Sequence, residues 1–174
     1  MLDFSQTKKK VYPLVKEGTY ETELKLEWSK TGNGDPFINC IFFIRTDVNQ
    51  EHQGERVFDG IYKNKATGEF NYNKIKGIIE TTVKKRYQFE DYDELIQELS
   101  GTLLRINVEI EKADESVPGS KDRNIVSYCS YQPTRFPVKG ASAPTVEEAK
   151  KQISENVQKE TSNDVSDDEE GLPW

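Results

Sequence analysis

The clearest structural signal in the chain is the stretch TYETELKLEW at residues 19–28. Its even-numbered positions carry the large apolar side chains Tyr20, Leu24, Leu26 and Trp28. Its odd-numbered positions carry the charged side chains Glu21, Glu23, Lys25 and Glu27. A two-residue alternation of this kind is typical of a strand with one buried face. We therefore expect a half-buried strand at residues 19–28.

The flanking sequence predicts four more strands and two helices. The turn-rich segment SKTGNGDP separates the first strand from FINCIFFIR at residues 37–45, whose face of Ile38, Cys40, Phe42 and Ile44 is wholly apolar. Further strands are expected at residues 56–62, 102–111 and 124–131. Apolar residues at helical spacing predict helices at residues 71–83, with Asn71 as a cap, and at residues 92–99.

This order of elements predicts a mainly β fold. Three strands, a helical segment and two further strands match an OB-fold-like five-stranded barrel, which has its helix between strands 3 and 4. Another small α+β domain is the alternative. We expect the OB-fold-like domain to span residues 1–136 and a flexible acidic tail to span residues 137–174, where large apolar residues become scarce.

The charge of the chain is concentrated in the tail. The net charge is −7, but residues 1–140 hold 21 basic and 22 acidic side chains, whereas residues 141–174 hold 3 and 9. The body is therefore nearly neutral. A nearly neutral body can carry a basic groove on one face, so its composition is compatible with nucleic-acid binding.

The residues that support most enzymes are scarce. His52 is the sole histidine, and neither Cys40 nor Cys129 has the close ligand spacing of a zinc site. No phosphate-binding loop is present. We therefore expect no catalytic residues, no metal and no cofactor. Both cysteines lie in apolar stretches and are expected to be reduced core residues, and no stretch is long and apolar enough for a membrane span or a signal peptide.

Aromatic and basic side chains share the faces of the second and third strands that are expected to point outward. Aromatic rings stack on bases of any sequence, and arginines bind phosphates. The candidate DNA-binding residues are Trp28, Lys30, Phe37, Phe43, Arg45, Arg56, Phe58, Tyr62, Lys63, Lys65, Lys74, Lys84, Lys85 and Arg86. The alternative is that these aromatic residues pack beneath the helices as a second core layer.

The C-terminal tip is the most specific motif. Its residues Asp167, Asp168, Glu169, Glu170, Leu172, Pro173 and Trp174 are candidates for binding a partner protein. An extended peptide of this kind can insert a terminal aromatic ring into a pocket and pair its carboxylate with a basic residue. The proline reduces the conformational entropy lost on docking.

The tip resembles the acidic tip of bacterial single-stranded DNA-binding proteins, which ends in acids, an aliphatic residue, Pro and Phe. Trp174 replaces the Phe, and Gly171 is inserted. The body resembles a phage family of the replication and recombination genes, long catalogued as a domain of unknown function. The matching residues are Gly18-Thr19-Tyr20, Lys30-Thr31-Gly32-Asn33, Arg56-Val57-Phe58-Asp59, Leu95-Ile96-Gln97-Glu98-Leu99-Ser100-Gly101 and Arg123-Asn124-Ile125-Val126.

Together the two resemblances imply a phage protein that binds single-stranded DNA in the host cytoplasm. Replication and recombination proteins are the expected partners of its tail, no membrane partner is expected, and homo-oligomerisation is left open. The alternative is a phage adaptor or inhibitor that binds a host protein and not DNA, since aromatic residues and arginine are also enriched in protein interfaces.

Overall fold

The computed structural model describes residues 12–128 and 130–140. The chain divides into two units, Met1–Ala141 and Ser142–Trp174, and the described residues belong to the first. Residues 141–174 of the predicted tail lie outside the described part. The elements, in order, are β1 (Gly18–Lys30), β2 (Pro36–Ile44), β3 (Arg56–Ile61), α1 (Tyr72–Thr81), α2 (Tyr92–Leu99), β4 (Leu103–Glu111), β5 (Arg123–Val126) and β6 (Gln132–Pro133).

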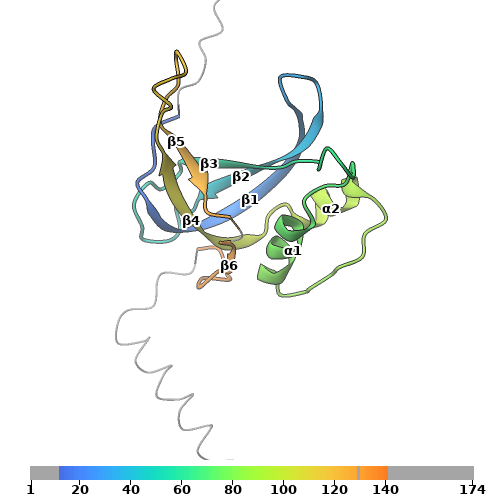
Figure 1. Cartoon of the computed structure of the whole chain (residues 1–174). Coiled ribbons are helices and arrows are strands. Elements are labelled where there is room, and N and C mark those ends of the chain that lie inside the picture. The colour runs from blue at the N-terminus through green and yellow to red at the C-terminus, as the bar shows by residue number, and fades with distance from the viewer. Residues whose placement is uncertain (1–11, 129, 141–174) are drawn as a thin grey trace, which may run out of the picture. The chain divides into compact units, whose positions relative to one another are not determined.

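The strands form one antiparallel sheet with the order β3-β2-β1-β4-β5, and β6 pairs with β4. Figure 1 shows that the sheet is strongly curved. The two edge strands, β3 and β5, approach each other, and some of their Cα atoms lie within 8 Å. The described strands nevertheless form no β-ladder between β3 and β5. The expected mainly β fold is therefore confirmed, and the sheet that forms it is open rather than closed.

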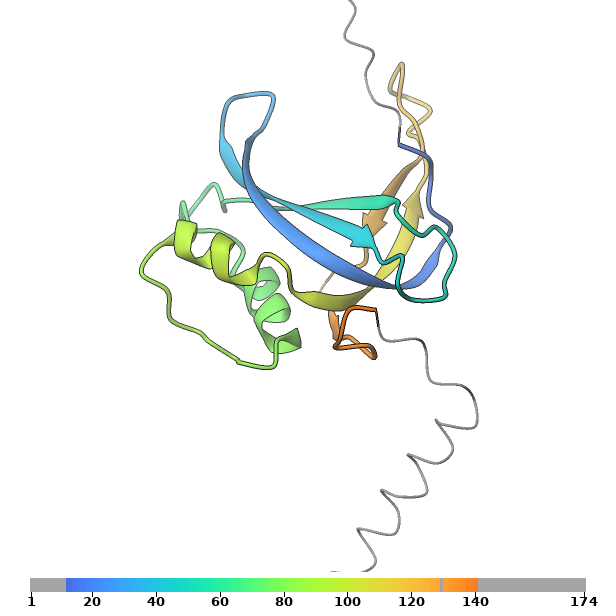
Figure 2. The same cartoon turned by 180° about the vertical axis from the view of Figure 1, so that it is seen from behind.

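The core lies on the face of the sheet that the alternating pattern predicts. Leu24, Leu26 and the apolar side of β2 are buried, and α1 and α2 pack against the same cluster through five buried side chains. These are Ile75, Ile78, Ile79, Leu95 and Leu99. The two helices lie next to each other on one side of the curved sheet (Figures 1 and 2). Burial of the free Cys40 thiol raises its pKa to about 12, so the thiol stays protonated and unreactive.

Helix α1 is shorter than the predicted segment 71–83. Asn71 caps its start as expected, because its side chain accepts a hydrogen bond from the Lys74 amide at 3.3 Å. Thr82 ends the helix by adopting an extended conformation, and its hydroxyl donates to the Ile79 carbonyl at 2.7 Å. Val83 consequently lies outside the helix and is 96% exposed, so the prediction that the helix extends to residue 83 was wrong.

The fifth strand also ends earlier than predicted. β5 stops at Val126 rather than at Tyr131. A turn follows, in which the Ser130 amide donates to the Ser127 carbonyl at 3.0 Å. The Ser130 hydroxyl accepts from the Asn107 amide at 3.2 Å and so occupies a backbone donor of the neighbouring strand. These serine contacts explain why the ladder with β4 does not continue.

Candidate nucleic-acid interface

The register of β2 and β3 brings the predicted aromatic side chains to one side of the sheet. Phe43 lies opposite Arg56, and Ile41 lies opposite Phe58. Residues opposite each other in an antiparallel pair point to the same face. This outer face is the one that points away from the core. Phe43 and Phe58 are half-buried in it, so the prediction that they lie opposite the main core is confirmed.

A groove of about 890 Å³ runs along the β3 side of the outer face, and we call it the aromatic groove. Three segments of the chain line it. These are residues 12–14, the β2–β3 face with Phe37, Asn39, residues 56–60 and Tyr62, and residues 121–125 of the β4–β5 hairpin. Because the last segment belongs to β5 and the loop before it, the groove lies where the two edges of the open sheet face each other.

Two rings are stacked within the groove. The centroids of Phe37 and Tyr62 are 4.8 Å apart, and their planes are inclined by only 19°. Tyr62 lies over Gly60, where a Cβ atom would come within 2.5 Å of its ring. Tyr62 is 51% exposed. A flat, preformed and accessible ring surface of this kind is what a nucleobase stacks on.

Arg56 supplies a positive charge to the groove. Its guanidinium carbon lies 4.9 Å from the centre of the Phe43 ring and 5.9 Å from that of Tyr12. Within the described part of the chain no carboxylate pairs with it. The rings orient the guanidinium without neutralising it, so it remains available for a phosphate.

The β4–β5 hairpin forms the opposite wall and adds two cations that the sequence patterns did not select. Arg123 pairs with Glu111, and this ion pair raises the pKa of the arginine. Lys121 is exposed, and no carboxylate among the described residues forms an ion pair with it. Tyr12 was missed as well. In the sequence, Arg123 stands out only as part of a motif of the resemblance, and no periodic pattern includes Tyr12.

An ion pair of β1 lies next to the groove residue Asn39. Glu27 lies opposite Asn39 on the outer face and accepts a hydrogen bond from that side chain at 3.4 Å. It also pairs with Lys25 at 2.9 Å. Lys25 and Glu27 neutralise each other, so this pair adds little net charge to the border of the groove.

Arg45 does not belong to this surface, contrary to the prediction. β2 ends at Ile44, and the Arg45 side chain is only 3% exposed. It makes a two-pronged contact with Asp47, through Nε at 2.9 Å and Nη2 at 2.7 Å. Its remaining contacts go to the C-terminal strap, which we define as residues 132–140: Nη1 donates to the Phe136 carbonyl at 2.6 Å and Nη2 to the Val138 carbonyl at 3.4 Å.

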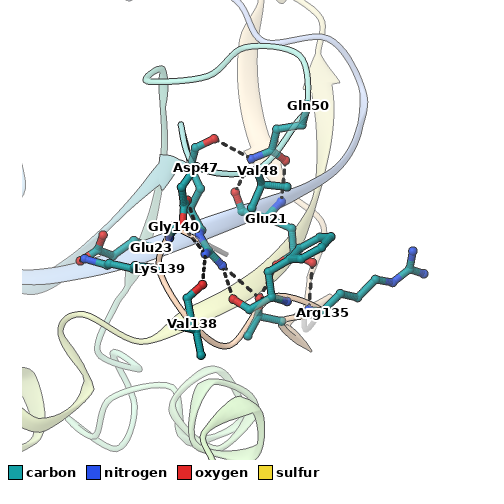
Figure 3. Close-up of polar contacts among 12 residues, drawn as sticks. Glu21, Glu23, Asp47, Val48, Gln50, Arg135, Val138, Lys139 and Gly140 are labelled. Carbon is teal, nitrogen blue, oxygen red and sulfur yellow. Dashed lines mark hydrogen bonds and ion pairs between the residues drawn. The ribbon is translucent and has the colours of Figure 1, made fainter. Parts of the chain in front are cut away.

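The other residues of this polar cluster hold the same strap (Figure 3). Glu21 is buried and accepts from the Arg135 amide at 3.0 Å, and Glu23 pairs with Lys139 at 2.8 Å. Asp47 accepts from the Gly140 amide at 2.7 Å. Residues 137–140, which the sequence had placed in the tail, are therefore bound to the sheet. The strap lies against Glu21 and Glu23 of β1, and none of its residues lines the aromatic groove.

Lys74 is also committed to the fold. Its ammonium group lies 2.7 and 2.8 Å from the two carboxylate oxygens of Asp59 and donates to the Gly60 carbonyl at 3.0 Å. The Tyr131 hydroxyl donates to the same carboxylate at 3.0 Å. Both charged side chains are largely buried. Lys74 thus neutralises a carboxylate beneath β3 instead of contributing a free charge to the outer face.

The basic run after α1 lies away from the aromatic groove and is largely neutralised. Lys85 pairs with Glu80 at 2.9 Å, which raises the pKa of the lysine. Arg86 pairs with Glu94 at 2.7 Å and lies over the Phe89 ring. Lys84 is exposed but does not line the groove. This basic run therefore presents little unpaired positive charge for binding an anionic ligand.

The remaining candidates do not line the aromatic groove. Lys30 and Lys65 are exposed, and the Lys63 ammonium lies 5.1 Å from the centre of the Phe70 ring. Trp28 lies opposite Ile38 and therefore on the core side of the sheet. Its indole packs at 5.8 Å from the Phe70 ring and donates to Asp93 at 2.6 Å, so Trp28 joins β1 to α2 and is not part of the groove.

The predicted partner-binding residues 167–174 lie outside the described residues. In the described part of the chain no cluster of His, Cys, Asp and Glu is arranged to hold a metal ion, and no helix is long and apolar enough to span a bilayer. Comparison with known proteins finds no matching family model and no matching curated protein.

Proposed function

We propose that this protein binds single-stranded DNA with little sequence preference and performs no chemistry on it. The observation that carries the proposal is the aromatic groove, which has an accessible stacked pair of rings at one end of β3 and, at the other end, an arginine that no carboxylate of the described residues neutralises. Stacking on aromatic rings is tolerant of sequence because every base has a π face, and arginine binds the phosphates between the bases.

The topology supports an OB-type fold as part of the same proposal. In that fold five strands form a partly open Greek-key barrel, and oligonucleotides bind across strands 2 and 3 between the loops that join strands 1–2 and 4–5. The order β3-β2-β1-β4-β5, with β3 approaching β5, agrees with a partly open barrel of this kind. The aromatic groove lies on β2 and β3 and is walled by the β4–β5 hairpin.

The setting and the partners complete the proposal. The acidic tip, with its terminal Leu172-Pro173-Trp174, is suited to capturing replication and recombination proteins while the body holds DNA. A phage protein acting in the cytoplasm of its host is the context that the sequence resemblance implies. The tail also carries a net charge of −6 and therefore has no affinity of its own for phosphates.

A salt titration of oligo-dT binding tests the proposal. We expect the logarithm of the binding constant to fall linearly with the logarithm of the salt concentration, with a slope of about −0.7 per phosphate contacted. Duplex DNA of the same length should bind much more weakly. A flat salt response, equal binding of both forms or absence of binding would refute the proposal, and in the last case the groove is better explained as a protein interface.

A pair of charge variants identifies the surface that binds. Arg56→Gln removes a cation from the aromatic groove and should reduce the slope of the salt titration by about 0.7, the value for one phosphate. Lys76→Gln removes an exposed cation from α1, outside the groove, and should leave the slope unchanged. Equal effects of the two substitutions would show that DNA binds by diffuse charge and not in the groove.

A further inference from the structure

The segment before β1 is hydrogen-bonded to β5, at one edge of the sheet. We call residues 12–17 the N-terminal strap. The Val15 amide donates to the Asn124 side-chain oxygen at 2.8 Å, and the Asn124 side-chain nitrogen donates to the Val15 carbonyl at 2.6 Å. Val15 itself is fully buried in the core. The Asn124 side chain therefore holds both polar groups of one backbone residue, as a neighbouring strand would.

Three further hydrogen bonds fix the following residues. The Lys16 amide donates to His52 Nε2 at 3.2 Å, and the Lys16 carbonyl accepts from the Tyr20 hydroxyl at 2.9 Å. The Glu17 carboxylate accepts from the Ile110 amide at 3.1 Å. The strap is thus attached to β1, β4, β5 and the β2–β3 connection, and its course is set by the body of the protein.

This attachment directs Tyr12 into the aromatic groove. Pro13 fixes its own φ and favours an extended conformation at the residue before it, so few orientations remain for Tyr12 once Val15 is held. The Tyr12 ring meets the Phe58 ring at 5.1 Å with an interplanar angle of 61°. The strap therefore contacts β3 through Tyr12 and β5 through Val15, and it bridges the two edges of the open sheet.

Tyr12 remains accessible although it contacts Phe58 and Arg56. It is 43% exposed, which leaves much of an aromatic ring in water at the wall of a groove. Covering such a ring with another flat ring is favourable, because it removes apolar surface from water and allows the two rings to stack. The neighbouring Arg56 guanidinium, 5.9 Å from the ring centre, is suited to the phosphate attached to such a group.

We propose that Tyr12 is a base-contacting residue and that Asn124 is its positioning residue. The N-terminal strap supplies this ring to the groove, in addition to the stacked pair of Phe37 and Tyr62. The ligand is a nucleobase of single-stranded DNA, so this inference rests on the proposed function. The strap is then part of the binding site and not only a covering of the core.

Fluorescence anisotropy with labelled oligo-dT tests the role of Tyr12 in the full chain. Tyr12→Ala should weaken binding about 5- to 150-fold, the loss expected for one stacked base, and Tyr12→Phe should keep most of the affinity. The slope of the salt titration should not change, because no phosphate contact is lost. Tyr87→Ala is the matched control, since Tyr87 is 49% exposed but does not line the groove.

A double-mutant cycle tests the positioning role of Asn124. Asn124→Ala should weaken binding in the wild-type background and have no further effect in the Tyr12→Ala background. If Asn124→Ala fails to fold, Pro13→Gly replaces it, because this change loosens Tyr12 while leaving the Asn124 contacts in place. Independent, additive losses would overturn the positioning role.

The possible results separate the inference from the proposed function. Wild-type affinity, or tighter binding, in Tyr12→Ala would overturn the inference while the proposed function stands, because the wild-type protein still binds oligo-dT. If the wild-type protein does not bind oligo-dT at all, both fail together. A loss in Tyr12→Ala matched by an equal loss in Tyr87→Ala would also overturn the inference.

Discussion

Gly60→Ala should disable one stacking surface of the groove without unfolding the protein. The added Cβ would lie 2.5, 2.5 and 2.6 Å from three atoms at the far end of the Tyr62 side chain. Ordinary carbon contacts are about 3.5–4.0 Å, so the ring must retreat by about 1 Å or more. That movement removes the parallel arrangement with Phe37 at 4.8 Å.

The effects on stability and on binding should differ. Loss of the aromatic pair costs about 0.5–1.5 kcal/mol, but replacing a strand glycine by alanine recovers about 0.5–1 kcal/mol of backbone entropy. The free energy of unfolding should therefore change by less than about 1 kcal/mol. Oligo-dT affinity should fall by about 1–3 kcal/mol, because a base loses its platform.

Urea unfolding and oligo-dT anisotropy measure the two quantities on the same samples. Gly32→Ala is the control, because a Cβ at this position meets no atom within 4 Å. Tyr62→Ala provides the second background, in which Gly60→Ala has no ring to displace and should leave oligo-dT affinity unchanged. Wild-type affinity of Gly60→Ala, or an equal loss in the Tyr62→Ala background, would refute the reasoning.

Phe58→Ala should weaken oligo-dT binding by about 1–3 kcal/mol and keep a cooperative thermal transition, whereas loss of that transition would show that the ring belongs to the core. Arg45→Met should lower the free energy of unfolding in urea by about 2–4 kcal/mol, because it deprives the Asp47 carboxylate and the Phe136 carbonyl of the buried guanidinium that donates to both, and a change below about 1 kcal/mol would contradict this. The Arg45 guanidinium holds the pKa of Asp47 well below its usual range, so wild-type stability should fall as the pH drops below about 4 toward that lowered pKa, and the variant should lose less over this interval. Deleting residues 167–174 should tighten DNA binding at low salt, with a gain that shrinks as the salt concentration rises, and should abolish capture of replication or recombination partners in a lysate pull-down. Trp174→Ala should leave DNA affinity almost unchanged and strongly reduce that capture, whereas recovery of the same partners by both variants and the wild type would contradict a recruiting role.

The strands were predictable because their alternation determines which side chains are buried. Leu24 and Ile38 lie on apolar faces that a one-residue shift in register would expose to water. The apolar pattern of the sequence therefore fixes the register in which the strands pair. The outward direction of Phe43 and Phe58 followed from the same alternation. The tight ends of α1 and β5 depended on hydroxyl contacts of Thr82 and Ser130, which alternation does not reveal.

The site was only partly predictable because its polar contacts are distant in sequence. Arg45 continues the alternation of β2 and so had been expected to face outward, but it binds carbonyls that are 91 and 93 residues away. Lys74 is one of several similar lysines, and only the fold reveals that it neutralises Asp59. Tyr12 lies in no periodic segment at all, so its place in the groove depended on Asn124.

The link between Val15 and Asn124 has a consequence for biosynthesis, because the two residues are 109 positions apart. Closing so long a loop is entropically costly and comes late in folding. A nascent chain that ends before β5 has no partner for Val15, so the strap cannot attach and the groove lacks the wall that carries Tyr12. We expect ribosome-bound chains to gain affinity for oligo-dT only after Asn124 has left the exit tunnel, and stalled chains of increasing length would measure this point.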